Sequence, residues 1–141
     1  MRLCAATLAL SVAACAEIPH DPERTEAQVR ESKAIRLGWV VGVRPEPKAL
    51  AVLARIQQAT GARTQNRAGD SETLLRELED GKIDLVYGAF AMDSPWARQV
   101  HLGKALDWRE DPPPHVSAPR FAYRNGENGW IMRVESEVAQ P

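Results

Sequence analysis

The chain has 141 residues, a length that suits one modest domain and leaves too little core for two lobes. Hydrophobic residues make up 44% of it and charged residues 26%, and the formal net charge is -1. This balance excludes a disordered, highly charged chain and offers no basic surface of the kind that binds nucleic acid.

The N-terminus has the features of an export signal. Arg2 supplies a positive charge, and the stretch from Leu3 to Ala14 is apolar but too short to cross about 30 Å of hydrocarbon as a helix. It ends in VAAC, where small residues precede a cysteine that can be acylated. We predict a signal peptide over residues 1–14 and a lipid on Cys15 that anchors the protein to the membrane. Ordinary secretion with cleavage after Ala16 is the alternative.

Cysteine content agrees with export. Cys4 lies in the predicted signal peptide, so the mature chain would keep Cys15 and form no internal disulfide. Ala16, directly after this cysteine, resembles the sorting context of outer-membrane lipoproteins. The expected location is therefore the periplasm, with the outer membrane favoured as the site of the anchor.

Residues 15–34 are polar and predict a tether between the lipid and the fold. Pro19 and Pro22 lie near its start. Residues 23–33 can form a helix, because Glu26 and Arg30 are an oppositely charged pair at i,i+4. We expect this helix to be solvated.

From residue 35 the pattern becomes that of an α/β domain. Residues 35–43 alternate as in a strand, with Gly38 and Gly42 leaving room on the other face. A buried helical stripe follows and ends at Gly61. Its members, at i, i+3, i+4 and i+7, are Ala49, Val52, Leu53 and Ile56.

A second round of strand, helix and strand follows. Residues 63–67 predict a short polar strand near an edge, and residues 83–90 predict an apolar strand. Between them, Asp70 or Ser71 can cap a helix that Gly81 ends. The buried residues of this helix are Leu74, Leu75 and Leu78. Such an order predicts a three-layer α/β domain with a mainly parallel sheet.

The C-terminal part predicts a return to the same lobe. Residues 107–119 are a Pro-rich connection, residues 120–124 a strand, and residues 127–138 a helix. One side of that helix carries Trp130, Ile131, Val134 and Val138.

Three segments within residues 35–106 carry a resemblance to a known family. LLRELEDGKIDLVYG, residues 74–88, is similar to the leucine-rich helix, Gly-Lys-Ile-Asp turn and following strand of the family 3 extracellular (periplasmic) solute-binding proteins. LGWVVGVRP, residues 37–45, resembles the first strand and its ligand-side loop, and DSPWARQV, residues 93–100, resembles the segment after the third strand. The resemblance implies one lobe of a type II periplasmic binding protein. It also implies a small polar solute as ligand and an ABC importer, or a second binding chain, as partner.

Two departures from the family pattern bear on function. When Val100 is aligned with the family, Trp96 stands where typical members carry an arginine that grips a carboxylate, and Ala91 stands for a threonine. A bidentate donor is thereby replaced by an aromatic face. The second departure is the missing second lobe, which residues 107–119 are too short to contain.

The predicted binding surface is the edge of the sheet where the strands end. In open parallel sheets the crevice lies beyond the carboxyl ends of the strands at a switch point, here the loops after Val43 and Gly88. The predicted ligand-binding residues are Arg44, Glu46, Asp93, Trp96 and Arg98. Solvated loop charges, a turn cap by Asp93 and packing of Trp96 under its loop are the alternatives.

Catalytic and metal-binding signatures are missing from the sequence. His20, His101 and His115 lack the paired spacing of metal ligands. Asp84 is expected to satisfy backbone donors, and there is no nucleophile elbow, phosphate loop or dinucleotide fingerprint. We predict a binding protein without cofactor, metal or catalytic residue. The alternative is a non-catalytic envelope lipoprotein that acts as a protein-interaction scaffold.

Overall fold

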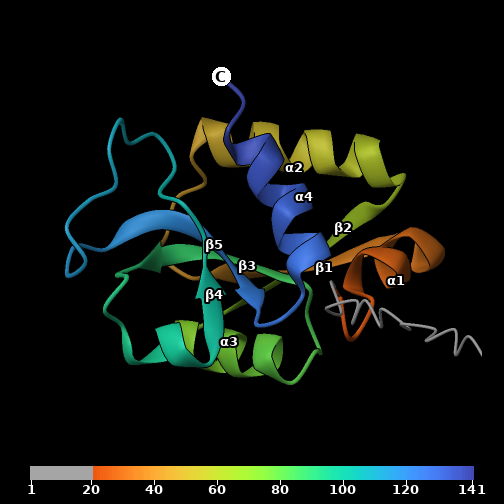
Figure 1. Ribbon diagram of the computed structural model, residues 1–141, viewed down its shortest axis with the longest axis horizontal. Coiled ribbons are helices and arrows are strands. Elements are labelled where there is room, and N and C mark those ends of the chain that lie inside the picture. Colours follow the sequence, from red (N-terminus) through yellow and green to blue (C-terminus); the bar gives the residue numbers. More distant parts are fainter. Residues whose placement is uncertain (1–20) are drawn as a thin grey trace, which may run out of the picture.

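Five strands form one sheet in the order β2-β1-β3-β5-β4 in the computed structural model, which describes residues 21–141 (Figure 1). The strands are β1 (Ala34–Val40), β2 (Arg63–Gly69), β3 (Leu85–Phe90), β4 (Val100–Leu102) and β5 (Ala118–Arg124). β1 runs parallel to β2 and β3, whereas β5 runs antiparallel to both β3 and β4. Four strands therefore share one direction, and the predicted mainly parallel sheet is confirmed.

Helices cover both faces of this sheet. They are α1 (Thr25–Ser32), α2 (Pro47–Thr60), α3 (Ser71–Glu79) and α4 (Asn128–Val138), with a short 3-10 helix, η1 (Pro95–Arg98). Figure 1 shows α2 and α4 on one side of the sheet, α3 on the other, and α1 beside the amino end of β1. The predicted three-layer α/β arrangement is thus present.

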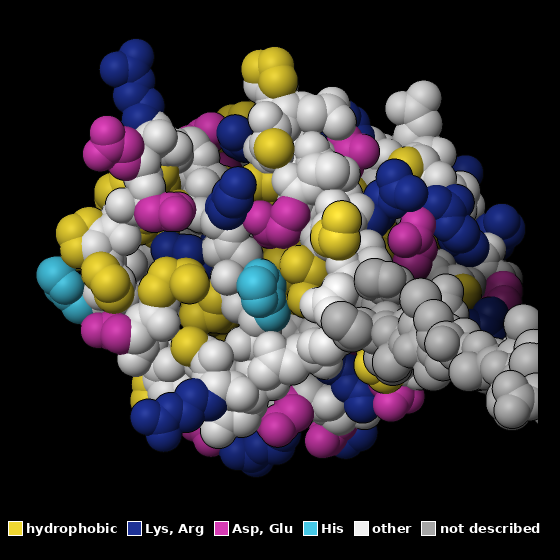
Figure 2. All heavy atoms as spheres, viewed as in Figure 1, with side chains coloured by type: hydrophobic (Ala, Val, Ile, Leu, Met, Phe, Trp, Pro, Cys, Tyr) yellow, Lys and Arg dark blue, Asp and Glu magenta, His cyan; other side chains and the backbone are white. Residues whose placement is uncertain are grey.

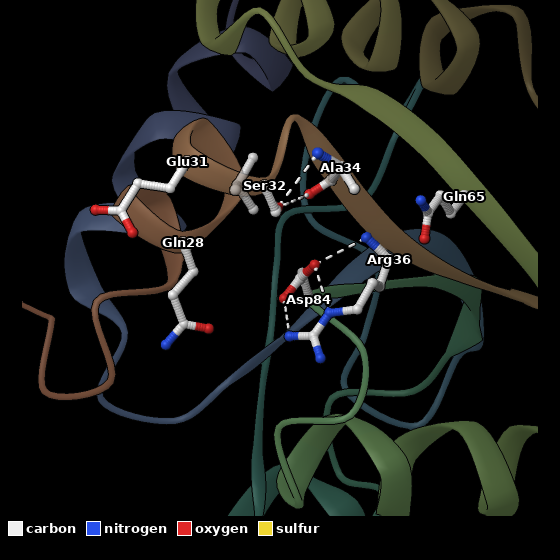
Figure 3. Close-up of a pocket in the computed structure, with 8 residues that line it drawn as sticks. Gln28, Glu31, Ser32, Ala34, Arg36, Gln65 and Asp84 are labelled. Atoms are coloured by element: carbon white, nitrogen blue, oxygen red, sulfur yellow. Dashed lines mark hydrogen bonds and ion pairs between the residues drawn. The ribbon is translucent and has the colours of Figure 1, made fainter.

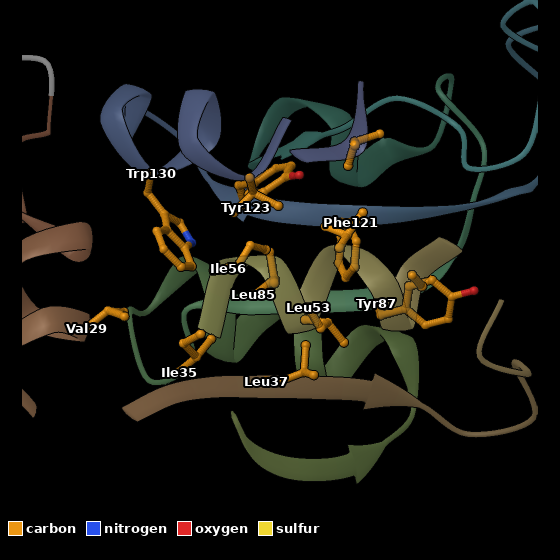
Figure 4. Packing of buried hydrophobic residues seen from close by; sticks show 14 of the residues in the cluster. Val29, Ile35, Leu37, Leu53, Ile56, Leu85, Tyr87, Phe121, Tyr123 and Trp130 are labelled. Atoms are coloured by element: carbon orange, nitrogen blue, oxygen red, sulfur yellow. The ribbon is translucent and has the colours of Figure 1, made fainter. Parts of the chain in front are cut away.

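The two faces of the sheet bury two separate cores, because successive side chains of a strand point to opposite faces. The larger core lies under α2 and α4 and is shown in Figure 4. Its strand residues are Ile35, Leu37, Leu85, Tyr87, Phe121 and Tyr123. The predicted stripes of α2 and α4 pack on them. The leucines of α3 bury the opposite face against Val40, Val86, Phe90, Val100, Leu102 and Ala122.

Glycines in and after β1 have different roles. A Cβ on Gly38 would lie 2.9 Å from Ile83 Cδ1 and 3.1 Å from Val86 Cγ2, so this glycine leaves room for the α3 side as predicted. Gly42 has φ +85°, and a Cβ there would meet nothing within 4 Å. Its role is a tight turn, because this φ suits glycine.

The first strand is shorter than predicted. β1 ends at Val40, not at residue 43, and Val41 is 69% exposed in the turn. The apolar alternation of residues 35–43 extends past the end of β1 because Val43 is apolar for a reason other than strand formation. It packs from the loop against both cores.

The predicted tether over residues 15–34 is wrong for α1, which packs on the lobe. Val29 is only 1% exposed, and Glu127, just before α4, accepts hydrogen bonds from the backbone nitrogens of Glu23 (2.8 Å) and Thr25 (2.9 Å). The predicted pair of Glu26 and Arg30 forms, although Arg133 of α4 also binds Glu26. Contacts from beyond residue 120 therefore fix a helix whose own sequence is mostly polar.

Residues 1–20 lie outside the described part of the chain, and with them the signal peptide, the start of the tether and Cys15. Within residues 21–141 we find no helix with the length and apolar content needed to cross a membrane.

β5 and β4 differ most from the sequence-based expectation. β5 begins at Ala118, inside the predicted connection over residues 107–119, and is longer than the strand predicted over residues 120–124. β4 and η1 were not predicted. β4 has three residues, Val100 to Leu102, which is too short for a period-2 pattern to stand out.

The neighbouring carboxyl groups of Asp21, before α1, and Glu127, before α4, give a pH-dependent prediction. Burial, a hydrogen bond with Glu127 and repulsion by the Glu127 charge raise the pKa of Asp21 to about 6. Between about pH 4 and this value the folded chain binds more protons at Asp21 than the unfolded chain, so stability falls as pH rises through that window. Although burial opposes it, the hydrogen bonds that Glu127 accepts from Asp21, Thr25 and Glu23 lower its pKa. The stability that ionised Glu127 contributes is therefore lost only at more acidic pH.

Asp21→Asn should therefore raise the thermal midpoint at pH 7.5 and leave it unchanged near pH 4. Because Asp21 is only partly buried, solvent screening leaves an effect on the order of 1 kcal/mol, or about 3 °C. Differential scanning calorimetry against pH measures it, with Glu79→Gln, an exposed carboxylate of α3, as control. An equal rise in both variants would contradict the assignment to Asp21.

Candidate functional site

Tyr87 fixes the loop that follows β1. Its hydroxyl donates a hydrogen bond to the carbonyl oxygen of Arg44 and accepts one from the backbone nitrogen of Glu46, both at 3.2 Å. Its ring packs between Trp39 and Phe121, with centroid distances of 4.8 and 5.5 Å. Burial raises the pKa of Tyr87, so the hydroxyl keeps its proton and its donor role. Sequence reasoning missed this residue, which was visible only as one apolar position of a strand.

The loop after β1 carries two of the predicted site residues. Arg44 is exposed and Glu46 is half-buried at the start of α2. Because β1 and β3 are neighbours in the sheet and run parallel, their following loops meet at the same edge, which we call the carboxyl edge.

The loop after β3 carries the other three. The Ser94 hydroxyl accepts a hydrogen bond from the backbone nitrogen of Trp96 (3.3 Å) and begins η1, so the alternative role of Asp93 as the cap is wrong. The backbone nitrogen of Asp93 donates to the carbonyl oxygen of Pro114 (3.1 Å), and Asn125 donates to the carbonyl oxygen of Arg98 (3.1 Å). These bonds join the loop to both ends of the segment around β5.

The structure brings Asp93 and Arg98 together. Both are exposed, and both line a hollow of about 420 Å³, the η1 hollow, with Ser94, Pro95 and Gln99. Asp93 follows the carboxyl end of β3, but η1 leads the chain back toward the amino edge, because Val100 pairs with Arg124 at the C-terminal end of β5. Arg98 therefore lies away from the predicted edge. Trp96 is half-buried and packs against the α3-side core, as the alternative expectation had it. Arg44 and Glu46 lie on the neighbouring loop.

A second hollow, the amino-edge hollow, lies at the amino ends of β1 and β3. It measures about 520 Å³, and Gln28 of α1 and Gln65 of β2 line it around Arg36 and Asp84 (Figure 3). The Asp84 carboxylate accepts hydrogen bonds from the backbone nitrogen (2.8 Å) and the Nε (3.1 Å) of Arg36, and pairs with its Nη2. Figure 3 shows these two side chains facing each other. Their charges are committed to joining β1 to β3, so Asp84 has the structural role expected for it, with donors from β1.

Within residues 21–141, no three histidine, cysteine, aspartate or glutamate side chains group as metal ligands do. His101 and His115 are both exposed, and His20 lies outside the described residues.

Comparisons with known proteins identify the fold. No family model matches the sequence, and no curated protein matches it. The arginine-bound form of domain 1 from TmArgBP matches with TM-score 0.63 and 11% identity, over 79% of this chain and 95% of that one. The ancestral cationic amino acid solute binding protein AncCDT-1 matches with TM-score 0.62 and 8% identity, over 81% and 92%.

A third solved structure agrees with these two. A polar amino acid ABC uptake transporter substrate binding protein from Streptococcus thermophilus matches with TM-score 0.58 and 10% identity, over 79% of this chain and 81% of that one. The structural neighbours of this chain are thus amino-acid-binding solute-binding protein domains, and at these identities the likeness is one of fold. The fold of this chain is that of one lobe of a periplasmic binding protein.

Removal of the Tyr87 hydroxyl tests the placement of the loop after β1. Tyr87→Phe should speed hydrogen exchange at the Glu46 amide and lower stability by about 1 kcal/mol, since one donor and one acceptor lose their partner. Tyr123→Phe, which removes a hydroxyl bound to Glu135, is the matched control and should leave the Glu46 amide unchanged. An unchanged Glu46 amide in Tyr87→Phe would show that the loop is held by other contacts.

Proposed function

We propose that this chain is a lipid-anchored, periplasmic solute-binding lobe that takes a small polar solute at its carboxyl edge. The observation that carries the proposal is the match to domain 1 of TmArgBP, of which 95% is covered by this chain. That domain was crystallised in an arginine-bound form, so a lobe of this fold can hold a solute without a second lobe in the same chain.

The charges of the loops after β1 and β3 support a dipolar ligand. Asp93 and Arg98 line one hollow, and neither takes part in an ion pair within residues 21–141. An ammonium group can pair with the first and a carboxylate with the second. Arg44 and Glu46, on the adjacent loop, offer the same two signs of charge.

A partner is part of this proposal. With one lobe the carboxyl edge stays open, and an enclosed site buries most of a ligand's surface. An ABC importer, or a second binding chain, would supply the missing wall. The solute-binding protein from Streptococcus thermophilus, which belongs to an uptake transporter, supports the importer.

A thermal-shift titration tests the solute site. Arginine, other amino acids, small organic acids, polyamines and sugars are titrated against the purified chain, and a solute that binds the native state raises the midpoint in a saturable way. Asp93→Asn and Arg98→Met should each weaken that response by up to about fivefold, because each removes one exposed charged contact. Trp96→Ala, which also loses core contacts, is read only against its own ligand-free midpoint.

The matched control is Trp108→Ala, since Trp108 is 46% exposed in the connection before β5 and lies outside the proposed site. A stable fold without any shift at millimolar solute would contradict the proposal. It would favour the scaffold alternative, which light scattering would support by detecting a defined oligomer.

Cys15→Ser tests the anchor. The chain expressed in a Gram-negative host should incorporate an alkyne-labelled fatty acid and sediment with the outer membrane, and the variant should lose both properties. The lipid requires the thiol as its point of attachment. A soluble, unlabelled parent chain would instead favour ordinary cleavage after Ala16.

A further inference from the structure

Arg120, in β5, is a buried cation without an ionic partner in residues 21–141. Its side chain is among the largest that are fully buried, and the residue is 1% exposed. It takes part in none of the ion pairs formed by the described residues. A buried charge is costly to a fold unless it is paired.

Two of the three guanidinium nitrogens have a structural role. Nε donates to the carbonyl oxygen of Phe90 (3.0 Å) at the end of β3, and Nη1 donates to that of Gly103 (2.7 Å) just after β4. Nη1 also lies 3.0 Å from the sulfur of Met92. The third nitrogen, Nη2, is buried and has no hydrogen-bond partner. Joining the ends of β3 and β4 therefore gives no role to Nη2 and does not account for a charged side chain at this position.

The nearest acidic groups do not neutralise Arg120. Burial lowers its pKa, and the charges of Asp111 and Glu135 oppose this effect. Glu135 is engaged elsewhere, because its carboxylate accepts hydrogen bonds from the Tyr123 hydroxyl (2.5 Å) and from the backbone nitrogen of Lys104 (3.2 Å). Asp111 is exposed in the connection before β5.

Arg120 lines a hollow of about 550 Å³, which we call the Arg120 hollow. Apolar side chains of Met92, Leu102, Pro112 and Pro114 form much of its wall. Its other lining residues are His101, Gly103, Lys104, Asp111 and Glu135. Figure 2 shows hydrophobic side chains gathered over β4, β5 and the loop that joins them, with basic atoms recessed among them. The Arg120 hollow and the η1 hollow share no lining residue.

We propose that the Arg120 hollow binds a small monocarboxylate with an apolar body, whose carboxylate pairs with Arg120. The apolar wall accepts the hydrocarbon part, and the guanidinium offers Nη2 together with Nη1. Met92 is 41% exposed and has a flexible thioether side chain, so it can leave Nη1 when the carboxylate arrives. Asp111 and Glu135 disfavour a dianion such as phosphate through like-charge repulsion. This site does not depend on the solute site at the carboxyl edge.

Hexanoate is the probe, and hexanol, of the same chain length but neutral, is its control. Saturation-transfer NMR with the purified chain measures binding of both, and the Nε–H resonance of Arg120 reports contact with the guanidinium. The dissociation constant of hexanoate should be at least tenfold lower than that of hexanol, and hexanoate should shift that resonance. Inorganic phosphate should not shift it.

Three variants separate the assigned contacts. Arg120→Met, which keeps an apolar side chain of similar length, should lower hexanoate affinity at least tenfold. Asp111→Asn should raise the affinity severalfold, because it removes a competing and repelling charge from an exposed position. Arg109→Met, an exposed cation of the same connection, should change it less than twofold.

The proposal is overturned if hexanoate and hexanol bind equally or if Asp111→Asn leaves the hexanoate affinity unchanged. It is also overturned if hexanoate fails to bind at about 10 mM, a concentration at which even a very weak site would be occupied. Should Arg120→Met fail to fold, the Nε–H shift and the Asp111 variant still decide. Hexanoate binding without any response to amino acids would support the Arg120 site while the proposed solute site fails. A response to amino acids without hexanoate binding would reject the Arg120 site and leave the solute site standing.

Discussion

The position of β5 is the constraint on which the remaining structure depends. This strand runs between β3 and β4 and against the direction of both, so it supplies hydrogen bonds to each. It gives Phe121 and Tyr123 to the larger core and Ala122 to the smaller one. Because it returns the chain to the amino edge, α4 can pack beside α2, and Glu127 can bind the backbone of α1. The last part of the chain therefore closes the lobe from both ends.

Much of the fold could be predicted from local pattern, and the parts that could not share a cause. The stripes of α2, α3 and α4 followed from helical spacing, and β2 was correctly placed at an edge from its polar sequence. β4 was not predicted, and α1 was predicted as a helix but wrongly expected to be solvated, because each is short and is stabilised by distant residues. Val29 is the main apolar anchor of α1, and no sequence window around it shows that Glu127 will satisfy its first turn.

The site residues were predicted from topology, and the limits of that prediction are visible in single residues. The rule of the carboxyl edge selected the two loops, and Asp93 and Arg98 of the second loop line one hollow, although η1 carries Arg98 away from that edge. It could not separate them from Trp96, since an aromatic residue in a loop serves a core as well as a ligand. Tyr87 and Arg120 were missed because their importance lies in buried polar atoms, and a strand pattern records only that a position is inside.

Charges of the amino edge and charges of the predicted site are used differently. At the amino edge, Asp84 joins the neighbouring strands through Arg36, and Glu26 binds both Arg30 and Arg133. In the loops after β1 and β3, Arg44, Glu46, Asp93 and Arg98 take part in none of the ion pairs found in residues 21–141. The fold thus commits the first set of charges to stability and leaves the second set available to a ligand.

Solvent exposure limits the binding free energy that these unpaired charges can supply. An ion pair at an exposed site contributes about 0–1 kcal/mol, so two such contacts on an open lobe would supply at most about half of the roughly 4.1 kcal/mol that corresponds to a millimolar dissociation constant. Excluding water strengthens the same contacts, because the effective dielectric falls. A second wall from a partner would do this at the carboxyl edge. Arg120 is desolvated by the lobe itself, so a ligand that reaches it meets an already buried charge. A lobe of this kind can therefore gain affinity for a ligand either by recruiting a wall from a partner or by burying the cation in advance.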